Sequence, residues 1–291
     1  MKTALRVTAF TLGLTAAFGL ALGVGHAAGP GGKPAPAGHG GHEEHAAGHA
    51  GHADAAPGGL QVSERGYTLS LDNPFVTAGG TTDLRFRILG PDGHPLTAYQ
   101  QQHEKELHLI VAPRDLSTFQ HLHPTRAEDG TWSATTAVPA AGEYRVFADF
   151  LPIGESEGLT LGADLHATGD LRPAPLPETG RSVDVDGYTV TLDGDLTPGA
   201  GGELTLAVSK DGRPVTDLQP YLGAYGHLVA LRAGDLAYLH VHPESTTPGP
   251  GITFHATAPS AGSYRLFLDF KHGDTVRTAA FTLATPAAHQ H

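Results

Sequence analysis

A triplet of histidines occurs twice in this sequence with the same spacing. In both copies 13 positions separate the first histidine from the second (108 to 121, 227 to 240), and a His-x-His pair precedes a proline. Neutral imidazole is a good ligand for Zn, Cu and Ni ions, so three imidazoles at a repeated spacing predict a divalent-metal site in each copy. The six candidate ligands are His108, His121, His123, His227, His240 and His242.

Strand geometry explains why this spacing suits a metal ion. Residues i and i+2 of a strand share one face, so the two histidines of each His-x-His pair project together. The first histidine begins the preceding apolar run, and a chain reversal at PRDLS or RAGDL returns the pair beside it. We expect three imidazoles to converge at one sheet end, with a fourth position for water or a carboxylate.

Two aspartates at equivalent places are weaker candidates for the fourth ligand. Asp149 lies in FADF and Asp269 in FLDF, each near the end of a later apolar run. The alternative is that these carboxylates cap a turn or form an ion pair with Arg145 or Arg265, four positions earlier. His103 also lies close to the first triplet, but the second copy has a leucine there, so His103 is not part of a site common to both copies.

The duplication extends well beyond the histidines. The segment AGEYRVFADF at 141–150 parallels AGSYRLFLDF at 261–270, and each repeat is about 100 residues, a common domain size. We place domain one at 60–175 and domain two at 181–285. The intervening LRPAPLPETG, rich in proline, is typical of an extended linker.

Short apolar or alternating runs such as YTLSL, DLRFRIL and YRVFADF, separated by Gly, Pro and Asp, are typical of strands. They predict an all-β chain with two tandem immunoglobulin-like or cupredoxin-like β-sandwiches of about seven strands each. The chain has no cysteine, and its single methionine is Met1. Sulfur ligands are therefore missing from both domains, which excludes a blue-copper centre and soft Cu(I) sites.

The first 28 residues have the features of an export signal. Lys2 and Arg6 precede an apolar stretch at 7–24, and small residues follow at a suitable cleavage point. Residues 1–28 are thus a signal peptide or, if uncleaved, an N-terminal membrane anchor, which is the only membrane contact we expect. Either outcome predicts an extracytoplasmic protein that is secreted, periplasmic or attached to the cell envelope.

Residues 29–59 are rich in Gly, Ala, Pro and His and are expected to be disordered. We expect the same of the histidine-containing tail at 286–291. Five histidines of the longer segment could collect divalent ions, although a solvated spacer is the alternative. They are His39, His42, His45, His49 and His52.

The charge balance narrows the function classes. With 18 Lys and Arg against 30 Asp and Glu, the net charge is −12, which argues against nucleic acid as a partner. The sequence contains no His-Glu-x-x-His. We therefore expect a binding protein and not an enzyme.

The paired segments EKELHLIVAPRDLSTFQHLHP and YLGAYGHLVALRAGDLAYLHVHP resemble those of bacterial secreted or membrane-anchored tandem β-sandwich proteins with a His-rich segment, associated with heavy-metal handling. The resemblance covers residues 60–285. It implies copper as the favoured ion. For sites of three imidazoles we expect Cu(II), with Zn(II) as the second choice. We expect an envelope metal transporter or chaperone as the exchange partner.

These observations predict an exported divalent-metal binding protein that buffers or delivers copper through one three-His site in each sandwich. Because neutral imidazoles are required, metal affinity should fall as the pH drops through about 6.5. The alternative function is a non-metal envelope interaction or structural module, in which the histidines brace a sheet end by hydrogen bonding.

Overall fold

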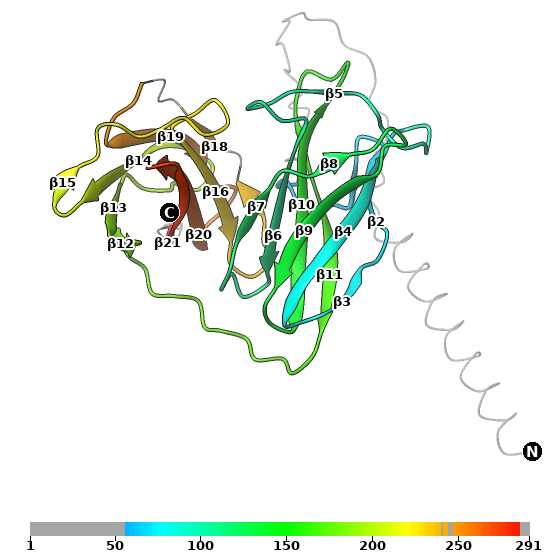
Figure 1. Ribbon diagram of the computed structural model, residues 1–291, viewed down its shortest axis with the longest axis horizontal. Coiled ribbons are helices and arrows are strands. Elements are labelled where there is room, and N and C mark those ends of the chain that lie inside the picture. Colours follow the sequence, from blue (N-terminus) through cyan, green and yellow to red (C-terminus); the bar gives the residue numbers. More distant parts are fainter. Residues whose placement is uncertain (1–55, 240, 244–246, 286–291) are drawn as a thin grey trace, which may run out of the picture. The chain divides into compact units, whose positions relative to one another are not determined.

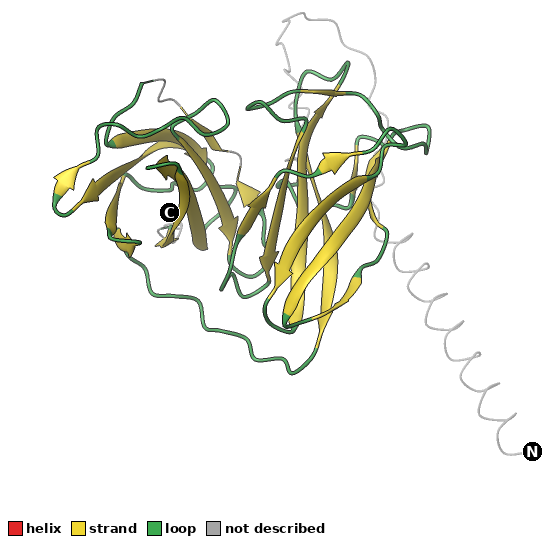
Figure 2. Ribbon diagram, in the orientation of Figure 1, coloured by secondary structure: helices red, strands yellow, loops and turns green. Residues whose placement is uncertain are grey.

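The computed structural model describes residues 56–239, 241–243 and 247–285, and of residues 242 and 243 it describes the backbone only. The described residues form strands and loops, without a helix (Figures 1 and 2). The prediction of an all-β chain with two tandem sandwiches is confirmed. No helix of the described part is long and apolar enough to cross a membrane.

Domain one is built from eleven strands whose buried residues alternate with exposed ones wherever one sheet face meets solvent. In β4, Leu84, Phe86 and Ile88 point inward while the arginines between them point outward. The strands are β1 (Ser63–Glu64), β2 (Tyr67–Leu71), β3 (Phe75–Thr77), β4 (Gly80–Leu89), β5 (Tyr99–Gln100), β6 (Leu107–Pro113), β7 (Gln120–Leu122), β8 (Thr125–Arg126), β9 (Trp132–Val138), β10 (Gly142–Pro152) and β11 (Leu159–Thr168).

Domain two repeats this plan with ten strands. They are β12 (Ser182–Val185), β13 (Tyr188–Asp193), β14 (Gly201–Lys210), β15 (Arg213–Pro214), β16 (Gly226–Arg232), β17 (Tyr238–Leu239), β18 (Val241–Pro243), β19 (Gly251–Thr257), β20 (Ser263–His272) and β21 (Thr275–Ala284). A long loop joins β11 to β12 (Figure 1).

The sheet order is that of an immunoglobulin-like sandwich. In domain one, β2-β4-β9-β8 faces the sheet that contains β11-β10-β6-β7, and β3 joins the second sheet parallel to β11. Domain two has β13-β14-β19-β18 and β17-β16-β20-β21. Each domain also has the tyrosine corner of this fold. Tyr144 Oη donates to the Ala140 carbonyl at 2.9 Å, and Tyr264 Oη donates to the Ser260 carbonyl at 2.6 Å.

Each sandwich has its own core, and a third apolar cluster joins the two domains. It contains Ile110 and Phe147 of domain one and Val229 and Phe267 of domain two, all buried. These residues lie on the faces of β6, β10, β16 and β20 that point away from each domain's own core. Every residue of β6 is buried because both faces of the strand are covered, and this explains why its sequence is a continuous apolar run. The described residues of both domains belong to one compact unit.

The contacts between the domains are reciprocal. Phe119 of domain one stacks on Phe267 of domain two, with ring centroids 4.3 Å apart. Tyr238, which occupies in domain two the place of Phe119, packs against Phe147 of domain one at 5.7 Å. Matching contacts in both directions are the property of an isologous interface, here formed between two halves of one chain.

One expected boundary is wrong. We placed 29–59 in the disordered segment, but Gly58 forms a β-bridge with Tyr238 and Gly59 donates its amide to the Thr160 carbonyl at 2.7 Å. Gly59 has φ +75°, and a Cβ there would lie 2.5 Å from Phe147 Cδ1. Only glycine fits this close contact. Composition alone does not distinguish a glycine required by packing from one in a flexible spacer. Residues 1–55 and 286–291 lie outside the described residues.

Candidate metal centre

The three imidazoles of the first triplet lie together in domain one. β7 runs back along β6 with His121 opposite Ile110, so His108 and His121 share the face that points toward domain two. One ring nitrogen from each of His108, His121 and His123 lies within 4.8 Å of the other two. The arrangement arises from a hairpin between two short strands.

The hydrogen bonds of His108 define its protonation. Its Nε2 lies 2.9 Å from the Gln102 carbonyl oxygen, and its Nδ1 lies 3.0 Å from His121 Nε2. Because a carbonyl oxygen only accepts, Nε2 carries the proton and Nδ1 of the neutral ring has a free lone pair. His121 Nε2 therefore donates to His108 Nδ1 when no ion lies between them.

His121 is held from the other side by domain two. Its Nδ1 lies 3.0 Å from Asp269 Oδ2, and the two side chains are only 5% and 7% exposed. Asp269 also accepts a hydrogen bond from Thr278 Oγ1 at 2.5 Å. With Nε2 donating to His108 and Nδ1 facing a carboxylate, the His121–Asp269 pair needs one proton more than a neutral imidazole and a carboxylate carry.

A divalent cation would remove the need for that extra proton. If it replaced the proton between His108 Nδ1 and His121 Nε2, both nitrogens would act as ligands and His121 Nδ1–H would still donate to Asp269. This is the carboxylate–histidine–metal arrangement of metalloproteins. Tetrahedral coordination at Zn–N distances of about 2.0–2.1 Å separates two ligand nitrogens by about 3.3 Å, so the 3.0 Å pair would need to open only slightly.

His123 is the third candidate ligand, and one of its ring nitrogens makes no hydrogen bond in the described part of the chain. This nitrogen, Nε2, is buried. An unsatisfied buried polar atom costs about 1–3 kcal/mol. Coordination of a cation by His123 would satisfy this atom.

Burial keeps these rings in the form that binds metal. Desolvation lowers the pKa of His108 to about 4 and the pKa of His123 to about 3, and the neighbouring imidazoles lower both further. The rings are therefore neutral well below neutral pH, so ligation requires no deprotonation of His108 or His123 there. The expected pH of metal loss accordingly moves down from about 6.5, the value for a free imidazole.

The second triplet is described only in part. His227 Nε2 lies 2.7 Å from the Tyr221 carbonyl, which repeats the bond between His108 and Gln102, and burial lowers the His227 pKa to about 4. Its ring faces the first triplet across the interface, with its centroid 5.9 Å from that of His121. His240 lies outside the described residues and His242 only has its backbone placed, so convergence of the second triplet stays a prediction. His39, His42, His45, His49 and His52 also lie outside the described residues.

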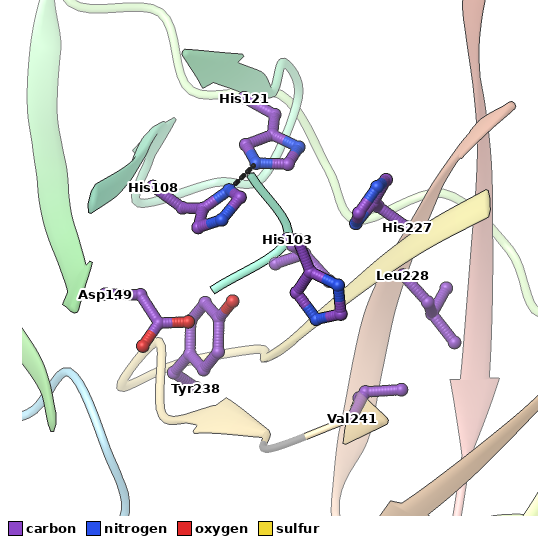
Figure 3. Close-up of a pocket in the computed structure, with 9 residues that line it drawn as sticks. His103, His108, His121, Asp149, His227, Leu228, Tyr238 and Val241 are labelled. Carbon is purple, nitrogen blue, oxygen red and sulfur yellow. Dashed lines mark hydrogen bonds between the residues drawn. The ribbon is translucent and has the colours of Figure 1, made fainter. Parts of the chain in front are cut away.

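A small cavity of about 60 Å³ opens between the rings of His103, His108, His121 and His227 (Figure 3), and His123 does not line it. Its polar lining consists of His103, His108, His121, Asp149, His227 and Tyr238. Since a water needs about 10–15 Å³ of such space, the cavity has room for an ion with a few small ligands.

His103 is the cavity residue that sequence reasoning set aside. Its ring centroid lies 5.3 Å from that of His227 and 6.1 Å from that of His108. The repeat comparison counted against His103 because Leu222 takes its place in the second copy. The one sequence feature that could have indicated a place for His103 at this site is its nearness to His108.

We expected Asp149 and Asp269 each to be a candidate ligand for the triplet of its own domain, and the structure gives them other contacts. Asp269 supports His121 of the other domain, and Asp149 accepts from Thr160 Oγ1 at 3.3 Å and lines the cavity. The alternative pairing with arginines is wrong, since residues four apart on a strand lie about 13 Å apart. The arginines bind elsewhere: Arg145 pairs with Asp164, and Arg265 donates to Thr282.

Comparison with solved structures gives distant likenesses. The Escherichia coli adhesin FdeC has 16% identity and a TM-score of 0.26, over 77% of this chain and 65% of that one. Salmonella alpha-2-macroglobulin has 13% identity and a TM-score of 0.27, over 79% of this chain and 15% of that one. The D0–D1 domain of intimin has 12% identity and a TM-score of 0.22, over 75% and 97% of the two chains. These scores are too low to support an inference about fold or function.

No curated protein matches the sequence. The family described as "Domain of unknown function (DUF8832)" matches it twice, over residues 61–164 and 183–287. The two matches cover both sandwiches and both histidine triplets. The chain therefore belongs to the DUF8832 family and carries its domain in tandem.

Proposed function

We propose that this chain is an exported divalent-metal binding protein and that domain one binds an ion through His108, His121 and His123. The observation that carries the proposal is the supported triplet. The remote nitrogens of His108 and His121 bond to a carbonyl and a carboxylate, their near nitrogens face each other, and His123 Nε2 has no hydrogen-bond partner in the described chain. Such outer bonds orient ligating imidazoles.

The ligand chemistry favours Cu(II), with Zn(II) as the alternative. Three imidazoles and no sulfur suit borderline divalent ions, and Cu(II) binds most tightly to nearly any such site. The role that follows is buffering or delivery of the ion, without catalysis, in exchange with an envelope transporter or chaperone. The export signal expected at 1–28 makes the location extracytoplasmic.

The His-rich segment fits this role as a supplier of ions. Tyr238, which lines the cavity, donates its amide to the Gly58 carbonyl at 2.9 Å, so the segment enters the fold beside the cavity. His52 is six positions earlier, and six residues reach at most about 20 Å. An ion collected by that segment would remain at high effective concentration near the triplet.

Metal stoichiometry by native mass spectrometry tests the proposal. A chain of residues 53–291, which is one compact unit, removes the five segment histidines. After equilibration with Zn(II) and with Cu(II), replacing His121 and His123 by Ala should remove one tightly held ion. The matched control is His166→Ala in the same domain, where the histidine pairs with Glu143 at the surface. Equal retention by all three chains would exclude the triplet as the site.

The second candidate function is a non-metal envelope interaction module. The hydrogen-bonded series from Gln102 through His108 and His121 to Asp269 favours it, because it braces the domains without an ion. In that case the His121 and His123 double variant would lose stability while its metal content stayed equal to that of the parent chain.

A further inference from the structure

We propose that the metal centre of domain one is coupled to docking of the two domains, with Asp269 of domain two as its positioning residue. The inference rests on the proposed function and adds a consequence. An ion bound by domain one stabilises the docked arrangement, and docking in turn tightens binding of the ion.

The connection between the domains at this point is direct and buried. His121 lies on β7 of domain one, and Asp269 lies on β20 of domain two, 3.0 Å away. Both side chains are less than a tenth exposed. The ligand set of domain one therefore lacks its supporting carboxylate unless domain two is docked.

Asp269 is held rigidly enough to position a ligand. β20 is an inner strand, bonded to β16 and to β21, with Asp269 opposite His227 on one side and Thr278 on the other. The Thr278 hydroxyl donates to Oδ1, which leaves Oδ2 for His121. β7, in contrast, is an edge strand of three residues bonded only to β6 in its sheet. Orientation of His121 therefore depends more on Asp269 than on the short strand that carries it.

The direction of the coupling follows from the chemistry of imidazole. A cation on Nε2 withdraws electron density from the ring and makes Nδ1–H a stronger donor to the carboxylate. Loss of such a supporting group typically weakens metal affinity about 10- to 100-fold. Because coupling is reciprocal, the docking equilibrium should shift by the same factor when the ion binds.

Hydrogen exchange of the full chain in Zn(II) or in chelator tests the coupling. His240→Ala and His242→Ala are introduced first, so that ions on the second triplet do not protect domain two directly. In this parent, Zn(II) should slow exchange in β6 of domain one and also in β20 of domain two. Asp269→Asn, which keeps the volume and an acceptor for Thr278, should bind Zn(II) about 10- to 100-fold more weakly and, at saturation, protect β6 alone.

The control is Asp184→Asn, which removes an exposed domain-two carboxylate that accepts from Thr189 Oγ1, far from the triplet in the sequence, and should retain protection of β20. If Asp269→Asn does not fold, Thr278→Val weakens the same support and should lower Zn(II) affinity, by less than loss of the carboxylate itself. Protection of β6 without β20 in the parent, or an Asp269→Asn variant equal to the parent, would overturn the coupling. Failure of Zn(II) to protect even β6 would instead overturn the proposed function, and the coupling with it.

Discussion

Acid should destabilise the metal-free protein through its buried histidines. His108 and His227 are 5% and 8% exposed, and burial lowers the pKa of each to about 4. In the unfolded chain both titrate near 6.5. Between these pH values the unfolded state binds more protons than the folded state, so the free energy of unfolding falls as the pH falls.

The size of the effect follows from the two pKa values. Lowering the pH from about 7.5 to about 5 protonates each histidine almost fully in the unfolded chain but in only a small fraction of folded molecules. This costs about 2 kcal/mol for each ring, hence about 4 kcal/mol for the pair. The contribution of the two neutral rings to the free energy of unfolding is complete above about pH 6.5. Below that pH the contribution falls, until the folded rings protonate near pH 4.

Urea unfolding with a chelator present measures this loss. Trp132, buried in domain one, reports through fluorescence, and far-UV circular dichroism follows both domains. The control replaces His108 and His227 by Gln, which can still donate to the Gln102 and Tyr221 carbonyls but does not titrate. The reasoning is refuted if the parent loses less than about 1 kcal/mol, or if the double variant loses as much as the parent.

Three further outcomes are expected. Zn(II) bound to domain one should be retained at about pH 5.5, because the pKa values of His108 and His123 lie at about 4 and 3. Elemental analysis after dialysis measures the retained Zn(II), and release near pH 6.5, the pKa of free imidazole, would contradict this. Phe119→Ala should destabilise the docked arrangement by about 3 kcal/mol in thermal unfolding, since its ring stacks on Phe267, and a change below about 0.5 kcal/mol would mean that the contact contributes little. Tyr144→Phe should cost about 1 kcal/mol in urea unfolding through loss of the bond to the Ala140 carbonyl, and an unchanged midpoint would exclude a stabilising tyrosine corner.

Local patterns accounted for much of domain one and part of its site. The alternation in β4 and the apolar run of β6 predicted strands, and the His-x-His spacing placed two imidazoles on one face. The hairpin after β6 then brought His108 beside them, because an antiparallel return is the shortest connection. Each of these inferences depends on residues within about 15 positions of one another, a range over which strand period and turn chemistry act.

Contacts between residues far apart in the chain could not be predicted in this way. His121 and Asp269 are 148 positions apart, and His103 lies near His227 although the second copy has no histidine at its place. The sequence feature that came nearest to indicating the interface is the apolar run in each of β6 and β16, because such a run requires cover on both faces of the strand. That requirement does not say which surface provides the cover.

By itself, the sequence determined an all-β chain with a duplicated domain, an acidic charge, no sulfur ligands in either domain, and the convergence of His108, His121 and His123. These properties follow from composition and from periods of two residues along a strand. Only the tertiary structure decided that the outer sheet faces of the two domains pack together and that Asp269 supports a histidine of the other domain. The physical reason is that burial of apolar faces is nondirectional, so the partner and register of two packed sheets depend on the shape of the whole interface.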